Sequence, residues 1–427
     1  MKGLPTKNAP SLAVVKPHFI FGALALFALA VLTVLADTNL LGAYFSNKML
    51  AITHLAVLGW GSMIVFGALY QLIPVVFDTS LYSEKLALIT FWMFAVSIVF
   101  MVYSFWTAAF TTSLTHASVL MFISLLLFII NILATKKHGK TNIQSKFITG
   151  AVYWLFLTEL LGLLIAFNFK YNFFTEIHLH YLKVHAHLGL IGWFLLLIIG
   201  VSSTLIPMFF VSHQANEKKL NYTFYLINAG LFLLAFDGLF INSGFLIYLN
   251  WLLITLGIAF YLSFIAESYK KRLKKDLDVG MKYTVIAVLL MVVPLFLSLL
   301  ILINFNFESS LLMRITTLYG FSIIFGLITT IILGQTYKTL PFIIWLDKYK
   351  KYIGKYIIPL PRELYSEKIG KLQLYFYLIA IAAFTIGLLL NQMIAISIGS
   401  YAFLVVAVLY NINVFKIIFH KTKIEKL

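Results

Sequence analysis

Two stretches of the sequence are nearly copies of each other: His54-Leu-Ala-Val-Leu-Gly59-Trp60 and His187-Leu-Gly-Leu-Ile-Gly192-Trp193. The likeness continues through a second glycine and a proline in each stretch, Gly67 and Pro74 in the first and Gly200 and Pro207 in the second. A third stretch keeps the frame with Gly326, Gly334 and Pro341 but has Phe321 in the place of histidine. The copies are 133 and 134 residues apart, which indicates an internal repeat.

The composition is that of an integral membrane protein. Of the 427 residues, 62% are hydrophobic and 11% are charged, and the mean hydropathy is +0.97. A soluble domain is roughly 45–50% apolar and about 25% charged, so soluble enzymes, secreted disulfide scaffolds and disordered binders are excluded. Because the chain has no cysteine, a metal or cofactor must be held by His, Met, Asp, Glu or Tyr, and the ten histidines are the natural candidates.

Twelve apolar runs are long enough to cross a membrane, which takes about 20 residues in a helix. We place them at Pro17–Ala36, Leu50–Phe77, Leu86–Trp106, Leu114–Ala134, Phe147–Phe167, Lys183–Phe210, Tyr222–Phe240, Phe245–Ile265, Tyr283–Ile303, Leu311–Trp345, Leu372–Leu390 and Ile394–Phe415. The runs are continuous and do not alternate as the strands of a β-barrel do. The sequence therefore predicts an all-α, multi-pass membrane protein whose residues 1–427 form one domain.

The repeat predicts how these spans are arranged. Its copies are centred on residues 50–77, 183–210 and 311–345, and each copy comprises four spans, so every copy enters the membrane in the same direction. We expect three four-helix arcs with pseudo-threefold symmetry about the membrane normal. At about 100° per residue, the repeated glycines and proline lie opposite the histidine and allow a close helix contact there. His54 and His187 should then face an interior cavity.

The distribution of Lys and Arg predicts the orientation. All 32 except Lys48, Lys170, Lys183 and Arg314 fall on the side that holds both termini. We therefore expect both termini in the cytoplasm and the chain in the cell's inner (cytoplasmic) membrane. The net charge of +17 then reflects orientation and contact with anionic lipids of the bilayer, and it gives no support to nucleic-acid binding.

Twelve helices in three arcs, cytoplasmic termini, and histidines in the outer halves of the even-numbered spans resemble the catalytic subunit of the haem-copper oxidase superfamily. The resemblance covers the whole chain in architecture and spans two and six in motif. It implies that His54 is an axial ligand of a low-spin haem and that His185 or His187 of the sixth span is a copper ligand. It further implies an electron donor and partner membrane subunits.

The chain also departs from this family. The histidines that the family carries in spans seven and ten are missing, because residues 222–240 and 311–345 contain none. The usual oxygen-reducing centre cannot be assembled without them. We therefore interpret the chain as a divergent member, similar in spirit to membrane proteins of the nitric-oxide response, and whether it is an oxidoreductase stays open.

The candidate site residues support two hypotheses for a centre near the outer leaflet. The first is a b-type haem between spans two and six, with His54 and His187 or His185 as axial ligands and Arg314 bound to the propionates, suited to electron transfer. The second is a copper or zinc site made by His54, His116, His185 and His187, for chemistry with or response to a small gas such as nitric oxide or oxygen.

Further alternatives remain for the function and for other polar residues. The function alternatives are a cytochrome c or quinol oxidase subunit I, and a histidine-lined transporter or scaffold without a cofactor. His178 and His180 are expected at the interface, as part of an entry path or in support of a ligand, and His18 on a solvated face. Glu159 and Asp237 are interpreted either as proton carriers or as carboxyl groups hydrogen-bonded to a neighbour.

Overall fold

The protein is described by a computed structural model that covers residues 8–212, 216–303, 307–421 and 425–426. Within this part of the chain, twelve helical segments are long and apolar enough to cross a membrane. The predicted all-α, multi-pass fold with twelve spans is thus confirmed, and the observed helices begin and end within a few residues of the predicted runs in most cases. The predicted arrangement in three arcs stays a prediction.

The spans are built from the following helices. Within the spans η marks a π-helix, and elsewhere it marks a 3-10 helix. They are α1 (Leu12–Ala36); α2 (Asn47–His54), η3 (Leu55–Ser62) and α3 (Met63–Phe77); α4 (Glu84–Trp106); α5 (Ser113–Lys137); α6 (Ile143–Tyr171); α7 (His178–His187), η4 (Leu188–Leu195) and α8 (Leu196–Phe210); α9 (Lys218–Phe236) and η5 (Asp237–Ile241); α10 (Leu246–Lys270); α11 (Val279–Leu290) and α12 (Val292–Ile303); α13 (Ser309–Phe321), η6 (Ser322–Thr329) and α14 (Thr330–Lys348); α15 (Glu367–Leu390); and α16 (Met393–Ile418). Short elements complete the described chain: the 3-10 helices η2 (Asp37–Leu41), η7 (Lys350–Tyr352) and η8 (Pro361–Leu364), and the antiparallel strands β1 (Tyr356–Ile357) and β2 (Glu425–Lys426).

Local sequence explains where several helices begin and end. Asn142 and Ser145 form a capping box at the start of α6, and the Asp278 carboxylate accepts the Met281 N–H (3.1 Å) at the start of α11. α6 and α15 end at Asn172 and Asn391, which adopt left-handed backbone angles with φ of 47° and 54°. Asparagine tolerates this conformation better than most residues, so it ends a helix without glycine.

The chain divides into two compact units. The first comprises the described residues of 8–9, 72–104 and 108–276, and the second those of 10–71, 105–107 and 277–427. The single domain expected from the sequence therefore stays a prediction, and each unit is described by itself.

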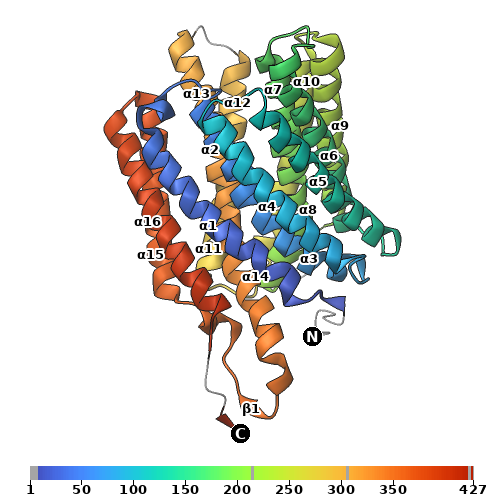
Figure 1. The fold of residues 1–427 in the computed structure, drawn as a ribbon. Coiled ribbons are helices and arrows are strands. Elements are labelled where there is room, and N and C mark those ends of the chain that lie inside the picture. The colour runs from blue at the N-terminus through green and yellow to red at the C-terminus, as the bar shows by residue number, and fades with distance from the viewer. Residues whose placement is uncertain (1–7, 213–215, 304–306, 422–424, 427) are drawn as a thin grey trace. The chain divides into compact units, whose positions relative to one another are not determined.

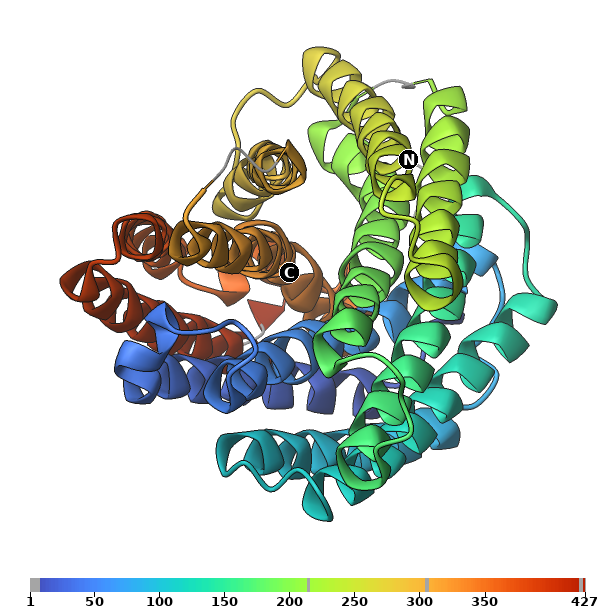
Figure 2. The same ribbon diagram turned by 90° about the horizontal axis from the view of Figure 1, so that it is seen from above.

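In the first unit, α9 and α10 run side by side (Figure 2). Glycines allow this close approach, because a Cβ atom at Gly230 would lie 2.7 Å from Ile254 and one at Gly257 would lie 2.7 Å from Ile227. The Thr223 hydroxyl donates across the same contact to the Gly257 carbonyl (3.0 Å). Small residues that let two backbones come together are the usual basis of helix packing in lipid.

In the second unit, α15 and α16 pack along each other and α1 packs against α16 (Figure 1). The Asn411 side-chain amide of α16 donates to the Ala23 carbonyl of α1 (2.8 Å). Beyond α14 the chain continues into β1, which pairs with β2 near the C-terminal end of the sequence. The two π-helical segments of this unit, η3 and η6, also contact each other.

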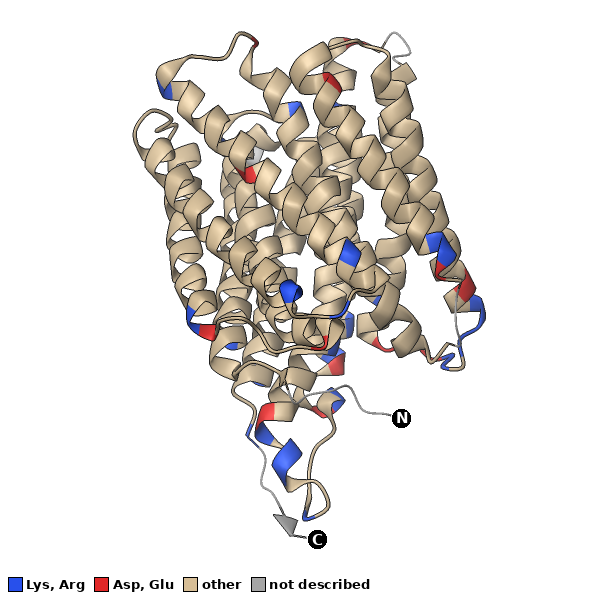
Figure 3. Cartoon of the chain, turned by 90° about the vertical axis from the view of Figure 1, so that its right-hand side faces the viewer, with Lys and Arg blue, Asp and Glu red and all other residues tan. Residues whose placement is uncertain are grey.

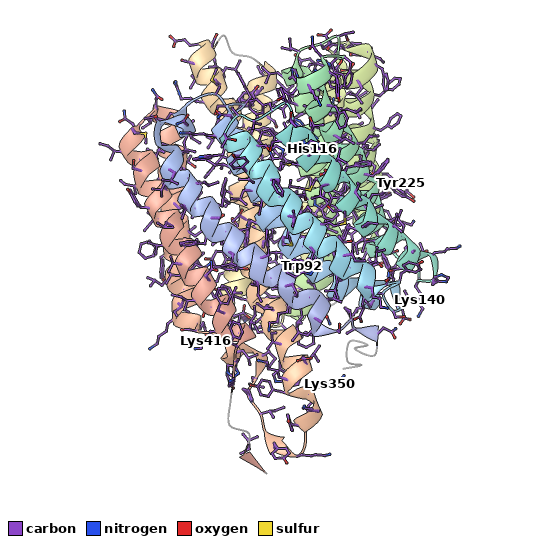
Figure 4. The ribbon with its side chains drawn as sticks, viewed as in Figure 1. Trp92, His116, Lys140, Tyr225, Lys350 and Lys416 are labelled. Carbon is purple, nitrogen blue, oxygen red and sulfur yellow. The ribbon has the colours of Figure 1, made fainter. Side chains whose placement is uncertain are left out.

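The surfaces of the spans fit a lipid environment. Large apolar and aromatic side chains point away from the helices, such as Trp92 and Tyr225, which are 67% and 61% exposed (Figure 4). Charged residues gather toward helix ends and connections, and the middle of the spans is largely free of them (Figure 3). The protein is therefore a multi-pass membrane protein.

Candidate ligand histidines and the repeated π-helical turn

The sequence repeat corresponds to a structural repeat that sequence analysis missed. Each of its three spans contains an eight-residue π-helical segment, η3, η4 and η6, which begins directly after His54, His187 and Phe321 respectively. π-Helices are rare and occur frequently at functional sites. Nothing in a single stretch distinguishes a π-helix from an α-helix, but the constant interval between the three copies marks where to look.

Each copy of the repeat also has a glycine where its span closely contacts another helix. A Cβ atom at Gly67 would lie 2.7 Å from His18 in α1, one at Gly200 2.6 Å from Phe147 in α6, and one at Gly334 2.6 Å from Tyr283 in α11. In every copy the glycine thus packs against the preceding span, which is the close helix contact that sequence analysis predicted. The helix between histidine and glycine is not the uniform α-helix that this prediction assumed, because it contains a π-helical segment to which 100° per residue does not apply.

His54 and His187 have the same local hydrogen bond. His54 Nδ1 lies 2.7 Å from the Leu50 carbonyl oxygen, and His187 Nδ1 lies 2.7 Å from the Lys183 carbonyl oxygen, four residues earlier in each helix. A carbonyl only accepts, so Nδ1 carries the proton and donates, and the lone pair is on Nε2. Ligand histidines in metal and haem sites are oriented in this way.

The surroundings of His54 hold its ring in place. The imidazole stacks on Phe105 of α4, with ring centroids 4.5 Å apart and an interplanar angle of 27°. The side chain is half-buried at the junction of α2 and η3. An imidazole stacked on one face and hydrogen-bonded at Nδ1 is restricted in orientation, as a ligand must be.

His185 and His187 engage different neighbours, as their spacing predicted. His185 Nδ1 donates to the Thr158 carbonyl of α6 (2.9 Å), and a Cβ atom at Gly162 would lie 2.8 Å from its Cε1 atom. Gly162 therefore provides the space for this imidazole. His187 instead hydrogen-bonds within its own helix. Of the two, His187 has the geometry that matches His54.

His116 and Arg314 lie in different settings. His116 is exposed near the start of α5 (Figure 4). Arg314 of α13 is half-buried, and its Nε atom is buried with no hydrogen-bond partner within the described part of the chain. A buried guanidinium N–H without a partner fits an anionic group such as a carboxylate.

Among the described residues, no group of three or more His, Asp or Glu side chains is arranged to hold a metal ion. The four-histidine copper or zinc site therefore stays a prediction.

The contacts of Asp237 and His18 decide between the roles that the sequence left open or predicted for them. The Asp237 carboxylate accepts the Ser243 N–H (2.9 Å), so it is a hydrogen-bonded carboxyl group at the end of a span. His18 is fully buried, and the expectation of a solvated face is wrong. Its Nδ1 donates to the Val14 carbonyl (2.8 Å) and its ring contacts the Tyr70 ring at a centroid distance of 5.5 Å.

The second unit also contains buried polar side chains that sequence analysis did not predict, because they stand in otherwise apolar runs. The Tyr337 hydroxyl donates to Gln373 Oε1 (2.5 Å) and accepts from Asn413 Nδ2 (3.1 Å). The Tyr377 hydroxyl donates to the Phe325 carbonyl of η6. Since a π-helix changes the pairing of its carbonyls, the Tyr377 hydroxyl provides a partner for one carbonyl of the π-helical segment in the copy without histidine.

Comparison with known families decides the family. The model of the family described as cytochrome c and quinol oxidase polypeptide I matches residues 18–269, more than half of the chain. The chain belongs to this family. No curated protein matches the sequence. The part matched to the oxidase polypeptide I family includes spans one to eight, and with them both histidine-bearing copies of the repeat; the third copy lies outside it.

Proposed function

We propose that this member of the oxidase polypeptide I family is a membrane haem protein for electron transfer or small-gas chemistry, in which His54 and His187 are the axial ligands of a b-type haem. The observation that supports the proposal is their equivalence. Both directly precede a π-helical segment at the same position of the repeat, and both donate from Nδ1 to the carbonyl four residues earlier. The repeat is the basis for proposing that one iron binds both imidazoles.

The residues fit such a group in chemistry as well as position. Nε2 of a neutral imidazole is the nitrogen that binds haem iron, and it is the atom left to carry the lone pair in both histidines. Arg314, with its buried Nε, would hold a propionate. When bound, an iron with two imidazole ligands supplies reversible one-electron transfer.

Sequence features favour electron transfer over dioxygen reduction. The spans that carry the family's other ligands, Lys218–Ile241 and Ser309–Lys348, contain no histidine. The side chains of this chain therefore do not provide the usual second haem and copper. The orientation we propose, with the histidine-bearing span ends outside the inner membrane and both termini inside, follows from the positions of Lys and Arg.

The test is a reduced-minus-oxidised absorption spectrum with metal analysis on the purified full chain. We expect a Soret band in the wild type that is lost in His54→Ala and in His187→Ala. His138→Ala, an exposed histidine in a connection, is the matched control and should keep the band. Copper or zinc without haem would overturn the haem in favour of the four-histidine metal site, and the absence of both would leave the transporter or scaffold alternative.

A further inference from the structure

One buried side-chain amide makes two hydrogen-bond contacts that hold the connection between α6 and α7. Asn168 of α6 is 2% exposed. Its Oδ1 accepts the Phe174 N–H (2.7 Å), and its Nδ2 lies 3.0 Å from His178 Nε2, at the first residue of α7. These two contacts tie the end of one span to the connection and to the start of the next.

The first contact fixes the protonation needed for the second. A backbone N–H can only donate, so the atom of Asn168 that meets Phe174 must be the oxygen. The NH₂ group then faces His178 and donates to it. His178 Nε2 must therefore accept, which requires that this nitrogen carry no proton.

Aromatic rings hold His178 at this place. Its imidazole stacks on Phe169 with centroids 4.2 Å apart and an interplanar angle of 23°, and Phe169 stacks on Phe110 at 5.1 Å. A 180° turn of the ring about Cβ–Cγ keeps this stacking but brings the Cε1 carbon, and not the other nitrogen, to the place of Nε2. The acceptor role of Nε2 is thus set from two sides.

The other ionisable groups around the contact are engaged elsewhere or exposed. The Lys170 ammonium lies 5.2 Å from the centroid of the Tyr171 ring, and His180 Nε2 donates to the Gly238 carbonyl (2.6 Å). The Asp237 carboxylate accepts the Ser243 N–H, and the Tyr181 ring stacks on Phe174 at 4.0 Å. Glu176 and Lys183 are exposed.

We propose that Asn168 and His178 are positioning residues for α7, and that a single proton on His178 Nε2 releases their contact. The added N–H would point at the NH₂ group of Asn168, so two donors would face each other. Turning the amide over would repair this contact but would place the NH₂ group against the Phe174 N–H. Either way one hydrogen bond is lost, and the connection and the start of α7 loosen.

Loosening the start of α7 would also affect the candidate ligands, because they lie on the same helix. His178 begins the same α7 that carries His185 and ends at His187. If the proposed function holds, acidity at this end of the span weakens the placement of a ligand. Histidine is the side-chain type whose charge ordinarily changes between about pH 5 and 8, so the test compares two pH values in this range.

Hydrogen exchange of the full chain in lipid nanodiscs tests the proposal without any haem. We expect the protection factors of residues 172–181, corrected for the intrinsic pH dependence of exchange, to fall about tenfold between pH 7.5 and 5.5 in the wild type. In His178→Phe, which keeps an aromatic ring for the stack but does not titrate, they should be the same at both pH values. His116→Phe, a change of another histidine in the same unit, is the control and should behave as wild type.

A second variant should reverse the direction in which protection changes with pH. In Asn168→Asp the carboxylate still accepts the Phe174 N–H but now also accepts from a protonated His178, so protection should rise as pH falls. Equal protection of the wild type at both pH values, wild-type behaviour in His178→Phe, or unchanged sign in Asn168→Asp would each overturn the proposal. Because haem content does not enter this readout, failure here is distinguishable from failure of the haem proposal.

Discussion

At the scale of single residues, the contacts that decide most are those of glycine. Gly67, Gly200 and Gly334 each allow the preceding span to approach so closely that no Cβ atom fits. In lipid, helices gain little from burying apolar surface against each other, so the closeness of packing contributes much of the stability. The repeated glycines therefore matter to the fold.

Gly200→Ala should destabilise the protein, because its Cβ atom would lie 2.6 Å from that of Phe147, which has a fixed position on α6. Overpacking of this kind costs about 1–3 kcal/mol. Gly320→Ala is the matched control: Gly320 is also helical, but a Cβ atom there meets nothing within 4 Å, so stability should stay equal or rise by about 0.5–1 kcal/mol. Thermal unfolding in one detergent compares the two; equal Tm values would contradict the account.

At the scale of elements, the π-helical segment sets the direction of the histidine relative to the glycine contact. A π-helical turn contains about one residue more than an α-helical turn. Adding one residue to the α-helix between the π-helical segment and the glycine would rotate the two flanking parts by about 100° relative to each other. The π-helical segment thus determines the direction of the candidate ligand histidine relative to the glycine contact. The segment recurs in all three copies, although only two have a histidine to direct.

Insertion of one alanine after Leu197 of α8, between η4 and Gly200, should therefore remove the Soret band while the protein remains in the membrane, because His187 would turn away from its direction in the wild type. Insertion of one alanine after Ile331 of α14, between η6 and Gly334, is the control, since Phe321 there has no ligand role. It should retain haem. Absorption spectra of both variants, normalised to protein, give the comparison, and equal haem loss in the two would count against a ligand-directing role.

The same elements show what sequence can and cannot predict. The twelve spans follow from continuous apolar runs, and the glycine contacts follow from the repeat. The π-helices do not, because an apolar run satisfies α and π hydrogen bonding equally well. His18 was misplaced for a related reason: it lies near a lysine in sequence, but Tyr70 and Gly67 of another span cover it. A contact between spans that are distant in sequence thus decides the burial of His18.

At the scale of the whole molecule, orientation governs how the site meets its surroundings. We expect an impermeant maleimide added to intact cells to label Lys170→Cys and to leave Lys350→Cys unlabelled until the membrane is opened. Both lysines are exposed, and the chain has no cysteine of its own, so each variant carries a single thiol. Labelling of Lys350→Cys in intact cells would reverse the proposed orientation.

The central claim is that His54 and His187 bind one haem iron, and chemical rescue tests it most directly. His54→Gly leaves space where the imidazole was, so free imidazole can take its place at the iron. We predict that the purified wild type contains about one haem per chain with a low-spin spectrum, that His54→Gly and His187→Gly lose that spectrum, and that added imidazole restores it. A wild-type spectrum in either variant before imidazole is added would contradict the account.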